Sequence, residues 1–186
     1  MKALVLMAMA AAHLAAEPNA VTVYWWDNAG VPFGLRGAAT GIASRIYRDI
    51  GVEIDWQLRK PDRNGVGDAI VIEFRVFTPP TLMPGALAFA QPFEGTHIVV
   101  FYDRIRETVA KEHLLAHVMA HEIGHILQGV MHHSESGIMK ANWTLSDHGK
   151  MRYQPLTFTP YDIELIFKGM AQRAAKLQAA APPLVE

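Results

Sequence analysis

The most informative motif of the chain is His121-Glu122-Ile123-Gly124-His125. A helix advances about 100° per residue, so the two histidines lie on one face, one turn apart. Their imidazoles can then reach a single metal ion, while Glu122 lies to one side, where it can take a proton from water without becoming a ligand. Gly124 lowers the helix propensity, and we expect it to mark a place of close packing. The pattern predicts a zinc site built on a helix.

The predicted helix around this motif spans residues 107–128 and ends at Gly129. Four histidines recur along it at a spacing of four: His113, His117, His121 and His125. A solvated, histidine-rich helix face is therefore the alternative to a metal site. We assign His113 and His117 to packing or to support of the ligands.

Two further histidines, His132 and His133, follow just after the predicted end of the helix. A glycine in the left-handed conformation at position 129 would turn the chain back, so that one of them supplies a third ligand. A tight turn that ends in a methionine, Ser134 to Met139, comes next.

These residues together resemble the metzincins, a family of zinc peptidases. The family has an extended motif, His-Glu-x-x-His-x-x-Gly-x-x-His, and a methionine-bearing turn beneath the metal. This chain departs from the motif, because Gln128 stands at the place of the family glycine and Met131 at the place of the third histidine. The linker to the third ligand is longer by one residue if that ligand is His132, and by two if it is His133.

Matrixin-like metzincins are the members that the chain resembles most in detail. His133-Ser134 followed by Gly137-Ile138-Met139 is similar to the sequence after their third ligand, which favours His133 over His132. Residues 159–166 resemble the start of their C-terminal helix. The likeness covers roughly residues 20–177, and the segment 85–139 also resembles a group of uncharacterised bacterial metzincin-like proteins.

The resemblance implies an α+β, zincin-like fold: a twisted mixed sheet with an edge strand, a zinc-binding helix, a Met-turn and a C-terminal helix. It also implies a zinc endopeptidase, in which a zinc-bound water attacks the peptide bond and Glu122 is the general base. The implied zinc ligands are His121, His125 and His133. Tyr153 is a candidate partner for the oxyanion. We expect a peptide or protein substrate to bind in extended form along the edge strand.

Two other interpretations remain open. The longer ligand linker favours a catalytically weak or inactive zinc-binding or peptide-binding module of the same fold. A different zincin class would take its third ligand from a later helix, where Glu164 is the candidate. His97, close to the predicted edge strand, either lines the cleft or has a structural role.

The remaining elements follow from periodicity and turn residues. We expect strands at 21–26, 52–58, 69–77 and 96–102, an edge strand at 86–90, helices at 38–50, 107–128 and 161–177, and irregular structure over 131–158.

Composition sets the class of protein. With 186 residues, 51% of them hydrophobic and 19% charged, the chain suits one globular domain. A net charge of −1 without a Lys/Arg cluster argues against nucleic acid, and the lack of cysteine excludes disulfides and thiolate ligands. We expect a monomer.

The first residues have the pattern of a signal peptide. Lys2 precedes an apolar run over residues 3–12, and small residues end at Ala15-Ala16. We therefore expect a signal peptide at 1–16, a catalytic domain at 17–186, and a secreted or periplasmic protein without a stable membrane span.

Overall fold

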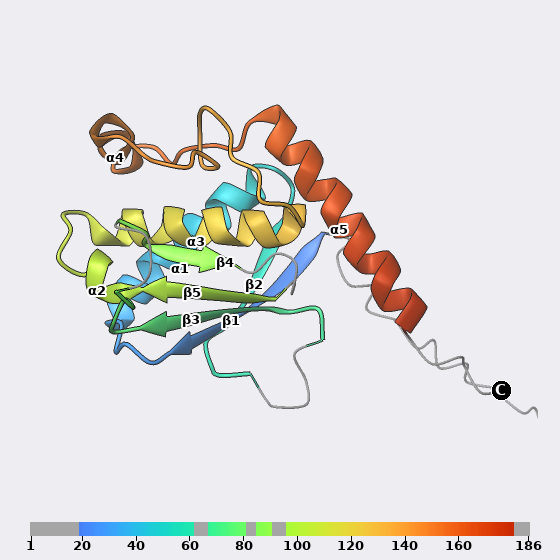
Figure 1. Ribbon diagram of the computed structural model, residues 1–186, viewed down its shortest axis with the longest axis horizontal. Coiled ribbons are helices and arrows are strands. Elements are labelled where there is room, and N and C mark those ends of the chain that lie inside the picture. The colour runs from blue at the N-terminus through green and yellow to red at the C-terminus, as the bar shows by residue number, and fades with distance from the viewer. Residues whose placement is uncertain (1–18, 62–66, 81–84, 91–95, 181–186) are drawn as a thin grey trace, which may run out of the picture.

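The computed structural model describes residues 19–61, 67–80, 85–90 and 96–180, so the predicted signal peptide lies outside the described residues. Within them, five strands form one twisted sheet in the order β2-β1-β3-β5-β4 (Figure 1). The strands are β1 (Ala20–Asp27), β2 (Glu53–Gln57), β3 (Ile70–Arg75), β4 (Ala88–Ala90) and β5 (His97–Phe101). The helices are α1 (Phe33–Arg48), α2 (Tyr102–Ile105), α3 (Lys111–Gln128), α4 (Leu145–Met151) and α5 (Pro160–Ala180).

The sheet is mixed: β1 is parallel to β2 and β3, β3 is parallel to β5, and only β4 runs antiparallel to its neighbour. Alternate residues of the strands turn apolar side chains to one face, as the two-residue period of a strand requires. Trp25 and Phe74 stack there with ring centroids 3.9 Å apart. Both side chains are buried in the main core.

Helices α1 and α3 cover this face of the sheet, with α1 packed against α3 (Figure 1). Tyr47 of α1 is fully buried and donates its hydroxyl to the backbone oxygen of Ala120 at 2.7 Å. This bond fixes α1 to α3 one residue before His121.

Strand β4 is the edge strand of the sheet, as predicted, although it has only three residues. Phe101 donates its backbone N–H to the oxygen of Leu87 at 2.9 Å. Hydrogen-bonding direction alternates along an antiparallel strand. The backbone groups of Ala88 and Ala90 therefore face away from β5, towards the open edge.

Two predicted helix starts are wrong, and one short helix was not predicted. Helix α1 begins at Phe33 rather than at residue 38, because Gly34 and Gly37 are helical here despite their low propensity. The predicted helix 107–128 begins only at Lys111, since Ala110 before it adopts a left-handed conformation with φ 57°. A short helix, α2, precedes that turn.

The segment 131–158, predicted to be irregular, contains helix α4. Thr144 caps this helix: its hydroxyl accepts from the backbone N–H of Asp147, and the Asp147 carboxylate accepts from the N–H of Thr144. The Thr-x-x-Asp spacing is the sequence signal for this capping box.

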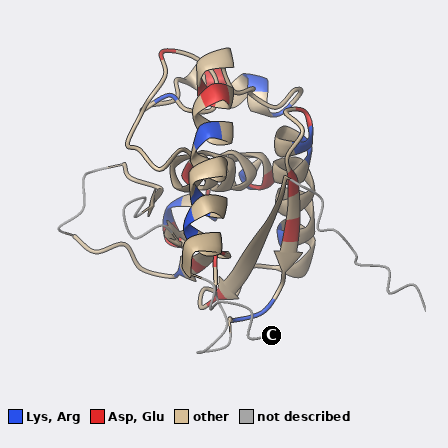
Figure 2. Ribbon diagram, turned by 90° about the vertical axis from the view of Figure 1, so that its right-hand side faces the viewer, with Lys and Arg blue, Asp and Glu red and all other residues tan. Residues whose placement is uncertain are grey.

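Helix α5 crosses the end of α3 and has an acidic residue, Asp162, in its first turn, where the helix dipole favours negative charge. Acidic residues lie near its start and basic residues further along, as Figure 2 shows for the helix nearest the viewer. Among the described residues, we find no helix with the length and apolar character needed to cross a bilayer.

Candidate metal centre

Helix α3 presents the two motif histidines from within the core. The side chains of His121 and His125 are 9% and 2% exposed. Their Nε2 atoms lie 3.0 Å apart, one helical turn from each other. Ligand nitrogens at about 2.0–2.1 Å from a tetrahedral zinc ion lie about 3.3 Å from each other, so this pair is close to the separation that zinc needs.

The chain brings His133 to the same point. Gly129 ends α3 in the left-handed conformation, with φ 68°, and the chain turns back as expected. The ring of His133 lies 5.3 Å from that of His121 and 4.9 Å from that of His125, between centroids. One nitrogen from each of the three rings lies within 4.8 Å of the other two.

His132 points elsewhere. Its Nε2 lies 3.3 Å from the hydroxyl of Ser134, and its ring packs edge-on against Tyr161 with centroids 5.1 Å apart. Of the two candidate third ligands, the structure therefore brings His133 to the pair on α3 and turns His132 towards α5.

The protonation of the histidines suits a metal ion. Nδ1 of His121 donates to the backbone oxygen of Ile138 at 2.9 Å, which leaves the lone pair on Nε2. Burial lowers the pKa of His121 to about 4 and that of His125 to about 3. The imidazoles are consequently neutral near pH 7, the form that ligates a metal. The three histidines are positioned to bind zinc, the predicted cofactor.

Glu122 is a buried carboxyl group beside the histidines. It is 8% exposed, and burial raises its pKa to about 8. The backbone N–H of Ala90, the last residue of β4, donates to it and lowers the pKa in part. The edge strand therefore ends at the group predicted to be the general base.

Met139 lies against helix α3 between His121 and His125. A Cβ atom at Gly124 would come within 2.8 Å of Met139 Sδ, so the predicted close packing at this glycine is confirmed. The turn itself is closed by the N–H of Ser134, which donates to the oxygen of Met139 at 2.8 Å.

The other sequence candidates lie away from the three nitrogens. His97 contacts Glu73 at 3.2 Å in the sheet, a structural role. His117 is buried and bonded to backbone groups on both ring nitrogens. Tyr153 is 88% exposed and Glu164 lies on an exposed face of α5. Among the described residues, neither Tyr153 nor Glu164 belongs to the metal-binding group.

Sequence reasoning missed several parts of the site. The oxygen of Ile138 and the N–H of Ala90 are backbone groups, which every residue carries, so no sequence signal marks them. Trp143 packs edge-on against His121, with centroids 5.6 Å apart. The sequence shows that Trp143 follows the methionine turn, but it gives no sign that this side chain contacts His121.

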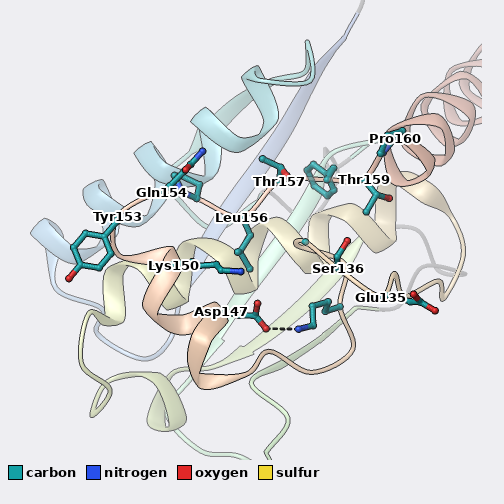
Figure 3. A pocket seen from close by; sticks show the side chains of 14 residues that line it. Glu135, Ser136, Asp147, Lys150, Tyr153, Gln154, Leu156, Thr157, Thr159 and Pro160 are labelled. Carbon is teal, nitrogen blue, oxygen red and sulfur yellow. Dashed lines mark hydrogen bonds and ion pairs between the residues drawn. The ribbon is translucent and has the colours of Figure 1, made fainter.

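A groove of about 790 Å³ lies between the methionine turn and the segment 153–160 (Figure 3). Its lining includes Gly137, Leu156 and the Lys140–Asp147 ion pair, and the ring of Tyr153 points outward at one end. None of the three converging histidines lines it. We therefore place the chemistry at the histidines rather than in this groove.

Comparisons with known proteins agree with the fold. Peptidase family M48 matches residues 80–153, the segment that includes β4, β5, α3 and the histidines. No curated protein matches the chain. The structure of archaemetzincin from Archaeoglobus fulgidus, complexed with malonate, is similar with a TM-score of 0.54 at 15% identity, covering 78% of this chain and 100% of that one. The chain therefore has a zinc metallopeptidase-like fold, similar to that of a metzincin.

Proposed function

We propose that the protein is a zinc-dependent endopeptidase. The observation that carries this proposal is the convergence of His121, His125 and His133 on one point, directly beside the buried carboxyl group of Glu122. Three neutral imidazoles leave one position of a tetrahedral zinc ion open, which is the arrangement of catalytic rather than structural zinc sites.

Zinc held by these ligands would polarise a substrate carbonyl and make water more acidic. The histidines hold the ion, and the bond from His121 to Ile138 fixes the orientation of the first ring. The Glu122 carboxylate takes a proton from the attacking water and passes it to the leaving amine. Burial raises the pKa of this group in the metal-free protein, and the positive charge of a zinc ion beside it would lower that pKa and favour the carboxylate that accepts the proton.

The edge strand supports a peptide as the substrate. Ala88 and Ala90 direct their backbone groups towards the open edge, and the Ala90 N–H reaches Glu122. An extended peptide that pairs with β4 would pass the carboxylate at the point where the strand ends. A peptide bond, rather than a compact metabolite, would then lie beside the proposed general base.

The more specific assignments are proposals as well. We propose that residues 134–139 are the Met-turn of a matrixin-like member, because Met139 packs at Gly124 beneath the ligands. We also propose that a catalytic domain at 17–186 follows a secretory signal peptide. The protein would act as a monomer outside the cytoplasm.

Cleavage of unfolded casein by the zinc-loaded protein tests the proposal. We expect the wild type to cleave it, and Glu122→Gln and Glu122→Ala to lose about 10²–10⁴-fold in rate while they retain one zinc per chain. Equal rates for all three zinc-loaded proteins would overturn the peptidase and support the inactive binding module. Zinc content, measured on the same samples, separates loss of metal from loss of the base.

A further inference from the structure

Asp162, near the start of α5, is a carboxyl group with no exposed surface. A buried carboxylate is costly unless its oxygens accept hydrogen bonds. Oδ2 accepts from the N–H of Thr159 at 2.8 Å and from its hydroxyl at 2.7 Å, which caps α5. Oδ1 does not serve the cap, since it accepts from the hydroxyl of Ser134 at 2.6 Å, 28 residues away in the chain.

The direction of this second bond is fixed by chemistry. A carboxylate only accepts, so Ser134 donates its hydroxyl proton to Asp162 and can in turn accept from His132 Nε2, 3.3 Å away. The chain of bonds runs from His132 through Ser134 to Asp162. His132 Nε2 thus carries a proton that points to the serine, and its lone pair is not offered to a metal.

Ser134 therefore links α5 to the segment around His133: it contacts His132 before that residue and Met139 after it. Its side chain is bonded to Asp162, and its backbone N–H donates to Met139 at 2.8 Å. His133 is the residue directly before Ser134, and it is exposed except where its ring contacts those of His121 and His125. The hydrogen bonds of its two neighbours help to hold its backbone in place.

Helix α5 is a rigid support for these bonds. A Cβ atom at Gly169 of α5 would come within 1.9 Å of the Leu127 backbone oxygen, so the two helices are in backbone contact. Leu127 lies on α3, two residues after His125. Helix α5, which holds Ser134 through Asp162, is therefore packed directly against α3, the helix that carries His121 and His125.

We propose that Asp162, acting through the hydroxyl of Ser134, positions His133 for the metal, so that both are positioning residues of the centre. This inference rests on the proposed zinc site. It explains how the chain keeps a third ligand after a linker that is two residues longer than in the metzincin motif: His132, within the longer linker, folds back onto Ser134 and α5. Loss of a residue that orients a metal ligand, without binding the metal itself, weakens metal binding by about 10- to 100-fold.

Zinc affinity, measured by competition with a chromogenic chelator, tests the proposal on the full chain. We expect Ser134→Ala to raise the zinc dissociation constant about 10- to 100-fold. Ser136→Ala, at an exposed serine in the same turn, is the matched control and leaves the constant unchanged. The absorption spectrum of the cobalt-substituted protein should lose intensity in Ser134→Ala alone, as the third imidazole leaves the ion.

A double-mutant cycle distinguishes positioning from a general structural effect. If Ser134 acts through His133, then Ser134→Ala has no further effect on zinc affinity in the His133→Ala background. An equal loss in both backgrounds, or no loss in the single variant, would overturn the inference and leave the peptidase proposal standing. A wild type that binds no zinc would overturn both. Should Ser134→Ala not fold, His132→Ala enters the same cycle, with a loss of several-fold in the wild-type background alone.

Discussion

Nδ1 of His121 donates a hydrogen bond to the backbone oxygen of Ile138 at 2.9 Å. The bond joins the helix that carries two of the histidines to the turn that follows the third. Ile138 is fully buried, and its own N–H donates to the oxygen of Thr157 at 3.0 Å. The backbone of Ile138, itself held by Thr157, thereby orients the ring of His121 before any metal binds.

The two adjacent histidines after α3 should differ sharply in their effect on metal binding. We expect His133→Ala to weaken zinc binding by more than about 100-fold, the upper limit for an outer partner, because it removes a ligand. His132→Ala should cost about 10-fold or less, because its Nε2 faces Ser134. Equilibrium competition with a chelator measures both. The reverse order would show that the third ligand is His132.

Removal of the metal should lower the thermal stability. A ligand at 100 times its dissociation constant stabilises the folded state by about 2.7 kcal/mol, which corresponds to about 5–10 °C in Tm for a chain of this size. Calorimetry with and without EDTA measures the shift, and zinc rather than magnesium should restore it. The double variant His121→Ala/His125→Ala, which lacks the site, should show no response to EDTA. A response equal to that of the wild type would contradict the site.

His117 should make the protein less stable in acid. Its Nδ1 donates to the oxygen of His113 and its Nε2 accepts from the N–H of Leu156 at 3.0 Å, so a second ring proton has no acceptor. Burial lowers its pKa from 6.5 to about 4. Between these pH values the unfolded chain binds more protons than the folded one, so the free energy of unfolding falls as the pH falls, on the order of 3 kcal/mol in total.

Urea unfolding of His117→Gln from pH 7 to pH 4 provides the comparison. Glutamine can accept from Leu156 but does not titrate, so the stability of the variant should fall less steeply with acid than that of the wild type. Parallel curves would show that His117 does not contribute to the acid sensitivity. Zinc-free protein should be used for both, so that loss of metal in acid does not enter.

The contact of α5 with α3 should tolerate no side chain at Gly169. Alanine there would place Cβ 1.9 Å from the Leu127 oxygen, a backbone atom that cannot move away on its own. We expect Gly169→Ala to destabilise the fold by about 1–3 kcal/mol. Gly41→Ala is the control: it lies in α1 with open space around it, and it should stabilise by up to about 1 kcal/mol through helix propensity. Chemical denaturation of both variants decides the point, and equal effects would exclude the close contact.

The parts of the site that the sequence could predict are those that depend on local spacing. Two histidines four residues apart must share a helix face, and Gly129 must end the helix, so α3 and its two histidines followed from the residues alone. The preference for His133 over His132 came from the resemblance to matrixins. Spacing alone could not supply it, because the bond between Ser134 and Asp162 joins residues that are far apart in the chain.

Two errors in the predicted secondary structure concern helices α1 and α4. Helix α1 starts early although Gly34 and Gly37 have low helix propensity, and Leu35 in this first turn packs against the core. Helix α4 was missed although the Thr144 and Asp147 pair of its capping box was present in the sequence. The resemblance to metzincins supplied the architecture of the sheet, which periodicity alone could not have arranged.

X-ray absorption at the zinc edge counts the imidazoles that bind the ion and is therefore the decisive measurement for the three-histidine site. For the zinc-loaded protein, we predict three imidazole ligands at about 2.0–2.1 Å and one oxygen ligand from water, with one imidazole fewer in His133→Ala. A wild-type spectrum with two imidazoles or fewer, unchanged by His133→Ala, would contradict the account.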